Sequence, residues 1–427
     1  MQRWSLAVLL LVSCGPKPAV RTALQGNLAD LRRDIANAQR SGKLDQDMAV
    51  KLAQAVGERE LTSAEGNNGA LRVRSLRSCA FPLRSAMEER AKKDDDVAAE
   101  LTLILVESHA VERTALLTRY VRVANGAWRA VAARAALRPV DTDLRKAFYF
   151  DPDARVRRAA LTTAVEVHDA GELEPLLEAA RLDPDPLSQS LAVRAVGSLG
   201  GERAVLALKD SWARADDTLR IAIVDAWSEH ASYVAGGARE LSLAAQSSGM
   251  AAVSASYALA SAGGPESVVA NARLRRDILE GTDDEKRLAL NIAPMNSETE
   301  AAIVKAAHEA SAELRVVALT RLSAMPAHRV DTIHALRDLA NAKPGSDAEQ
   351  RARDAAVAAL ASAGDTSVAA SLISDLRDKQ PQTRARAARG LTSLGDYTHA
   401  ASALADEDAN LRSEVACAIL ARESAQR

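Results

Sequence analysis

Apolar residues recur along most of the chain three or four positions apart, which is the spacing of one face of an α-helix. Near the start, one such stripe is formed by Leu24, Leu28, Leu31 and Ile35. The break at Ser41-Gly42-Lys43 then offers Gly42 for a left-handed helix cap, and Asp45 is suited to cap a second helix. The pattern therefore predicts a helical hairpin over residues 21–62, which ends in the turn-rich stretch "TSAEGNNG".

From about residue 128 the pattern repeats itself. "DPDARVRRAALTTAV" begins at Asp151, "DPDPLSQSLAVRAVGSLG" at Asp183 and "DDTLRIAIVDAW" at Asp216. Further units begin at Ser248, Asp283, Ser311, Asp347, Gln380 and Asp406. Each unit is a turn, a helix with apolar positions at helical spacing, and a second helix. Repeats of this length predict a solenoid, because no unit can bury its apolar face without its neighbours.

These units resemble HEAT repeats in their bacterial form, which carries an Asp-Pro turn and a Val-Arg pair. The resemblance runs from Trp128 to about Arg422, and residues 71–137 fit the same array in degenerate form. It implies an all-α fold, an α-α superhelix in which a HEAT-type solenoid of stacked helix pairs occupies residues 71–427. The helical hairpin of residues 21–62 precedes it.

The resemblance also implies a ladder in which a turn aspartate and a helix arginine hydrogen-bond from one unit to the next. The expected aspartates are Asp153, Asp217 and Asp284. The expected arginines are Arg157, Arg220, Arg287, Arg315, Arg353, Arg386 and Arg412. A planar guanidinium can satisfy a carboxylate or several carbonyls in a fixed geometry. We therefore interpret these arginines as structural rather than phosphate-binding, with the ladder interrupted at Gln189.

Composition agrees with slim, tightly packed helices. Of the 427 residues 48% are hydrophobic but only 3% are aromatic, whereas a sandwich or barrel needs more aromatic and β-branched residues. The formal net charge is −2, so no overall field attracts nucleic acid, and we expect none as a partner.

The first residues predict an export signal. The apolar run Leu6 to Val12 is seven residues long, whereas a membrane-spanning helix needs roughly twenty, so the run fits the core of a signal peptide. Leu11-Val12-Ser13-Cys14 resembles the lipobox of bacterial lipoproteins. The resemblance implies cleavage after residue 13, diacylglycerol on the Cys14 thiol, an acylated amine, and a tether over residues 14–20. The alternatives are an ordinary cleaved signal or a chance apolar start to a cytosolic protein.

A lipoprotein of this kind is expected in the bacterial cell envelope, bound to a membrane through its lipid anchor. In bacteria related to the enteric ones, an aspartate after the lipidated cysteine marks retention in the inner membrane. Residue 15 is glycine, so the resemblance implies the outer membrane, facing the periplasm.

The other two cysteines, Cys79 and Cys417, lie 338 positions apart, at opposite ends of the predicted array. Although the periplasm permits disulfides, we expect no bridge between them. Cys417 lies in the apolar stretch "EVACAILA", where a thiol behaves as a small core residue.

The sequence carries little catalytic chemistry. It has no nucleophile elbow, phosphate-binding loop, dinucleotide fingerprint or Cys-x-x-Cys pair. The single histidine cluster, His328-Asp331-His334, places its histidines six positions apart, on different sides of a helix, so we expect neither a metal nor another cofactor. A small basic group, Arg384, Arg386 and Arg389, is interpreted as a solvated face.

Two aromatic groups are candidates for a binding surface, or for side chains that fill a wider layer of the core. They are Phe148, Tyr149 and Phe150, and Trp212, Trp227 and Tyr233. The sequence favours a membrane-anchored, non-catalytic scaffold that binds protein partners. The alternative is a HEAT-like lyase or small-ligand protein with a pocket on its concave face, for which Cys79 is the candidate thiol.

Overall fold

The computed structural model describes residues 18–108 and 112–426, which form helices and no β-strand. The predicted all-α architecture is thus confirmed for this part of the chain. Cys14 and the signal peptide of residues 1–13 lie outside the described residues. None of the described helices is long and apolar enough to cross a membrane. The chain divides into two compact units, unit 2 (residues 87–371) and unit 1, which combines residues up to 86 with residues from 372 onward.

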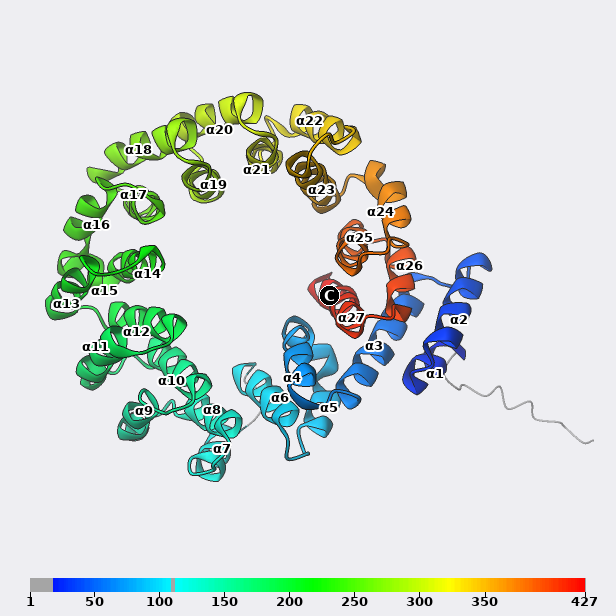
Figure 1. The fold of residues 1–427 in the computed structure, drawn as a ribbon, viewed down its shortest axis with the longest axis horizontal. Coiled ribbons are helices and arrows are strands. Elements are labelled where there is room, and N and C mark those ends of the chain that lie inside the picture. The colour runs from blue at the N-terminus through cyan, green and yellow to red at the C-terminus, as the bar shows by residue number, and fades with distance from the viewer. Residues whose placement is uncertain (1–17, 109–111, 427) are drawn as a thin grey trace, which may run out of the picture. The chain divides into compact units, whose positions relative to one another are not determined.

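Unit 2 is a curved stack of helix pairs, arranged in two rows (Figure 1). The row on the inner side of the curve contains α6 (Asp96–Glu107), α8 (Gly126–Ala135), α10 (Ala154–Val167), α12 (Pro186–Leu199), α14 (Asp217–Ser228), α17 (Met250–Ala262), α19 (Asp283–Ile292), α21 (Ala312–Ser323) and α23 (Asp347–Ser362). Each helix of this row packs against the next one in the order given. The inner row is therefore the continuous spine of the stack.

The outer row of unit 2 contains α7 (Arg113–Tyr120), α9 (Thr142–Phe148), α11 (Leu173–Leu182), α13 (Glu202–Trp212), α16 (Ala238–Ala245), α18 (Glu266–Glu280), α20 (Ser297–Glu309) and α22 (Arg329–Asn341). Short turns connect the rows, namely η2 (Pro139–Asp141), η3 (Ala170–Glu172), α15 (His230–Ser232), η4 (Tyr233–Gly237) and η5 (Thr366–Val368). Two helices, α5 (Ala80–Arg90) and α24 (Ala369–Asp375), contain the boundaries between the units.

Small side chains set the spacing between neighbouring inner helices. A Cβ atom on Gly197 of α12 would lie 2.5 Å from the Cα of Ala226 in α14, a distance that real Cβ atoms essentially never show. The core between the rows is accordingly rich in alanine, with Ala192, Ala195 and Ala226 fully buried. Because such close-packed layers interdigitate without voids, even one added methyl group must shift the backbone here.

Unit 1 joins the two ends of the chain. Its N-terminal part is α1 (Pro18–Gln25), α2 (Leu28–Arg40), α3 (Gln46–Thr62), α4 (Gly66–Arg74), η1 (Arg77–Cys79) and the start of α5. Its C-terminal part is α25 (Pro381–Leu394), α26 (Tyr397–Ala400), η6 (Ala401–Ala405) and α27 (Ala409–Gln426). The helix α3 packs along α27 (Figure 1). The helix α2 packs against η6.

The predicted start of the second helix of the hairpin agrees with the structure, because Asp45 caps α3 by accepting a hydrogen bond from the amide of Met48 at 2.8 Å. The segment nevertheless differs from the prediction in two respects. Residues 18–62 form three helices instead of two, and they do not make a separate module ahead of the solenoid. They belong to the same compact unit as the last repeats.

The expectation that Cys79 and Cys417 are separate thiols is wrong. The two residues form a disulfide with a Cα–Cα distance of 5.2 Å, and both are buried. The prediction failed because the repeat pattern describes contacts between successive units. It contains no information on whether the first and last helices of the chain meet.

Candidate binding surface

Four arginines share one geometry at the start of a helix of the array. In each, Nη1 donates to the backbone carbonyls five and six residues earlier, in the preceding turn, while Nε binds a carboxylate from another part of the chain. These arginines are Arg129, Arg157, Arg384 and Arg412. Each guanidinium therefore fixes its own turn and attaches the next structural element at the same time.

In unit 2, Arg157 donates to both carboxylate oxygens of Asp183, at 2.7 and 2.9 Å, and Arg129 holds Asp151 in the same bidentate way. Each aspartate opens the turn of the following repeat. The Arg157 pair is buried, with side-chain exposures of 10% and 2%. We call each of these arginine–aspartate pairs a rung of the ladder. Because separating the partners of a buried pair leaves an uncompensated charge, the rungs specify how successive repeats dock.

In unit 1, Arg384 holds Asp406 at 2.6 and 2.8 Å, and Arg412 is the last of the series. No repeat follows Arg412 within the described residues, yet its Nε still donates to a carboxylate, that of Glu60 in α3, at 2.7 Å. The side chain of Glu60 is 5% exposed. Glu60 therefore takes the position that the turn aspartate of a following repeat takes elsewhere.

The predicted aspartates of the ladder have different roles. Asp153 caps α10 by accepting from the amide of Arg155 at 2.9 Å, and its carboxylate pairs with the Arg155 side chain. Asp217 lies 3.9 Å from Arg220 of its own helix, and Asp284 is exposed. In both Asp-Pro-Asp turns the first aspartate receives the arginine that fixes the preceding turn, and the second aspartate caps the helix. In the turn at Asp183 the capping residue, Asp185, also pairs with Arg158 of the preceding repeat at 2.6 and 2.8 Å.

The remaining predicted arginines make weaker or different contacts. Arg287 pairs with Glu313 at 3.0 Å, and Arg386 lies 3.8 Å from Asp375. Three others contact the array through backbone carbonyls or an aromatic ring: Arg315 donates to Ala307, Arg353 donates to Ala340, and Arg220 lies over Trp212. Sequence reasoning missed Arg129 and Glu60 and took Arg384 for a solvated side chain. The signal that could have identified Arg384 is its spacing. It lies six residues after Asp378, whose carbonyl it binds, just as Arg157 lies six residues after Asp151.

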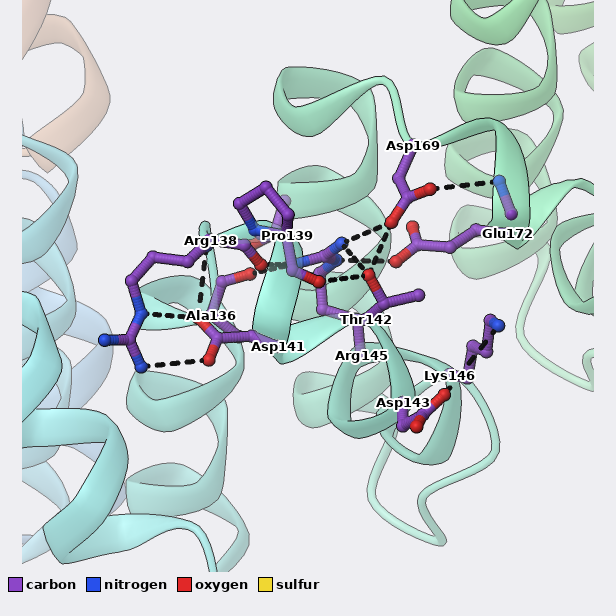
Figure 2. Close-up of polar contacts among 12 residues, drawn as sticks. Ala136, Arg138, Pro139, Asp141, Thr142, Asp143, Arg145, Lys146, Asp169 and Glu172 are labelled. Carbon is purple, nitrogen blue, oxygen red and sulfur yellow. Dashed lines mark hydrogen bonds and ion pairs between the residues drawn. The ribbon is translucent and has the colours of Figure 1, made fainter.

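A further buried network, centred on Arg145 of α9, lies in the same part of unit 2 (Figure 2). Arg145 is fully buried and uses all five of its donors. They reach Glu172 Oε1 at 2.7 Å, the carbonyls of Ala136 and Arg138 at 2.9 and 2.8 Å, Thr142 Oγ1 at 3.1 Å and Asp169 Oδ2 at 3.2 Å.

The second oxygen of Glu172 accepts a hydrogen bond of 2.6 Å from the hydroxyl of Tyr149. Burial and the adjacent carboxylate of Glu172 raise the pKa of Tyr149, so its hydroxyl stays protonated at neutral pH. The hydroxyl of Thr142 and the amide of Gly171 lower the pKa of Asp169, which stays ionised. With all five donors of Arg145 satisfied, this network fixes α9 against η3.

The aromatic groups are mostly core. Phe148, Tyr149 and Trp227 are buried, whereas Phe150 is 49% exposed. The partly buried Trp212 and Tyr233 pack against the core of unit 2, and the rings of Trp212 and Trp227 lie 5.3 Å apart. Of the two alternatives, core packing therefore describes Phe148, Tyr149 and Trp227. The half-exposed Phe150 and the partly buried Trp212 and Tyr233 keep part of their surface open to solvent.

No group of three or more histidine, cysteine, aspartate or glutamate side chains within residues 18–108 and 112–426 is arranged to hold a metal ion. His328 precedes α22 and its Nε2 lies 2.7 Å from Glu300 in α20, so it takes part in a contact between two outer helices. His334 is exposed on α22.

Residues 142–228, which include Arg145 and the Arg157–Asp183 pair, match the family model described as HEAT repeats. This match covers part of unit 2 and agrees with the repeat geometry there. A crystal structure of a mutant of Kap121p is similar to 94% of this chain at 13% sequence identity, with a TM-score of 0.35. The chain spans 56% of the length of that protein. No curated protein sequence matches the chain.

Within the described residues, the candidate functional feature is the set of side chains on the surface of the repeats. The charged residues with the best geometry are used within and between repeats. The large apolar residues that unit 2 exposes include Leu206, Leu243, Val268 and Val269 on outer-row helices, and Val234 in the connecting element η4. Exposed apolar groups of this kind mark interaction surfaces when they lie together.

Proposed function

We propose that the chain is a membrane-anchored HEAT-repeat lipoprotein that serves as a non-catalytic scaffold for protein partners. The observation that carries the scaffold role is the use of the charged side chains. In the Arg157–Asp183 pair and the Arg145 network, the polar groups bind each other and hold the repeats together. What remains for function is an extended surface, which suits recognition of another macromolecule over several repeats.

The anchor rests on the lipobox-like sequence that ends at Cys14, and we propose the periplasmic face of the outer membrane as its location. The bond between Cys79 and Cys417 supports an exported protein, because disulfides persist in oxidising compartments such as the periplasm and are rare in the bacterial cytosol. The same bond speaks against a lyase that uses Cys79. A nucleophilic cysteine must be a thiolate, whereas Cys79 is buried and bonded.

Two measurements test the proposal. Metabolic labelling with palmitate should mark the native protein and leave a Cys14→Ala variant unlabelled, and only the native protein should fractionate with the outer membrane. Crosslinking in cells, followed by mass spectrometry, should then give one abundant partner along the repeats. Labelling that persists in Cys14→Ala would contradict the anchor, and the absence of any partner in either version would contradict the scaffold.

A further inference from the structure

Helix α18 of the outer row exposes apolar side chains where its neighbour exposes polar ones. Val268 and Val269 are 67% and 74% exposed, and Ala272 is exposed one turn later. The next outer helix along the chain is α20 (Figure 1). Its exposed side chains include Glu298 and Lys305. The fold gains little burial energy from the two valines, which makes them candidates for a contact with another molecule.

The same face of α18 is hollowed. A groove of about 360 Å³ is lined along three turns by Val269, Ala272, Arg273, Arg275, Arg276, Leu279 and Glu280. This volume lies at the lower end of the range for ligand sites, and suits a few side chains of a docked segment better than a complete small molecule.

The arginines of the groove fall into two kinds. Arg273 is fixed within unit 2, since its Nε donates to Asp277 at 2.7 Å and its Nη1 donates to the carbonyls of Ala245 and Ser247. Arg275 and Arg276 are exposed, and neither makes an ion pair within residues 18–108 and 112–426. The groove thus offers two exposed guanidinium groups, without an ion pair in the described part of the chain, next to apolar surface, a combination that recognises carboxylates on an amphipathic segment.

We propose that this face of α18 docks an acidic, amphipathic helical segment of a protein partner, an inference that rests on the proposed scaffold function. Carboxylates of the segment bind Arg275 and Arg276, and its apolar side chains cover Val268, Val269 and the Leu279 end of the groove. We favour a protein over a membrane as the occupant, because a helix that enters the lipid interface often carries Trp or Phe on its apolar face, and α18 contains neither.

Binding of a synthetic probe tests the charge and the groove. The probe is a fluorescent helical peptide with leucines at i, i+3 and i+7 and glutamates elsewhere, added to the full chain and followed by anisotropy. We expect saturable binding that weakens with salt and falls about tenfold or more in Arg275→Glu/Arg276→Glu, because two charge-assisted contacts become repulsive. A matched charge reversal on α20, Lys305→Glu, should leave it unchanged. No saturable binding, or an equal loss in the control, would overturn the proposal.

Photocrosslinking in cells separates this proposal from the scaffold function. A photoreactive residue replaces Val269 on α18 or Tyr257, which is 40% exposed on the inner-row helix α17. Crosslinks from position 269 to an acidic segment with apolar residues at helical spacing, whose synthetic peptide then binds α18 in vitro, support the site. Crosslinks from position 257 alone retain the scaffold and refute the site. Crosslinks from 269 to lipid or to a second copy of the chain also refute it.

Discussion

The bond between Cys79 and Cys417 is expected to stabilise the whole chain, because it closes a loop with a sequence separation of 338 residues. In the chain-entropy model, a crosslink over a loop of this length removes conformational entropy from the unfolded state, which raises the free energy of that state by about 6 kcal/mol. A domain is typically stable by about 5–15 kcal/mol, so the bond is a large part of the total. Loss of the bond in Cys79→Ser should therefore lower the unfolding midpoint by far more than a surface substitution would.

Scanning calorimetry and urea unfolding of the oxidised protein, the reduced protein and Cys79→Ser measure this effect. Cys417→Ser should give the same loss, and the double variant should lose nothing further, because the two side chains act only through one bond. Cys14→Ala, which removes the third cysteine, is the matched control and should leave the midpoint unchanged. Equal midpoints for the oxidised and reduced protein would refute the reasoning.

Three further predictions concern buried groups and pH. Arg157→Gln should lower the free energy of unfolding by about 3–5 kcal/mol in urea titrations, because its buried carboxylate partner in the next repeat loses its counter-charge. Tyr149→Phe should cost about 1–3 kcal/mol by leaving one oxygen of Glu172 without a donor, and a loss near zero would contradict the network. Arg337 lowers the pKa of Asp365 from 3.8 to about 2, so this pair stabilises the fold above pH 3.8 and the contribution is lost as the pH falls towards 2. The stability gap between the native chain and Arg337→Gln should accordingly shrink between neutral pH and pH 2, and a constant gap would contradict it.

Much of the repeat architecture was predictable because it depends on the local spacing of apolar residues and on recurring turn sequences. Apolar spacing located the helices of unit 2, and the turn at Asp151 marked a repeat whose arginine, Arg157, lies in a rung. The partner within the turn was assigned to the wrong aspartate. Asp153 and Asp183 both lie in Asp-Pro-Asp turns, and the sequence does not distinguish the aspartate that caps a helix from the one that accepts an arginine.

Burial and long-range contact were not predictable in the same way. Tyr149 and Phe150 are adjacent in the sequence, yet the first is fully buried and hydrogen-bonded while the second is half exposed. Which one faces the core depends on how α9 meets η3, and no spacing encodes that orientation. Likewise, Glu60 lies outside any recognisable repeat, so its role as the partner of Arg412 follows only from the packing of α3 along α27.

The pairing of Glu60 with Arg412 has a consequence for how such a protein can change in length. Solenoids usually grow or shrink by duplication or deletion of repeats, including those at their ends, and truncation from an end is a common way to map a binding region. Here the site at which a further repeat would attach to α27 is already occupied by the N-terminal segment of the same chain. A shortened C-terminus would remove the support of α3, and an added repeat would have to displace it. Repeats can therefore be inserted or deleted without this conflict only inside the array, and binding regions must be mapped by internal substitutions.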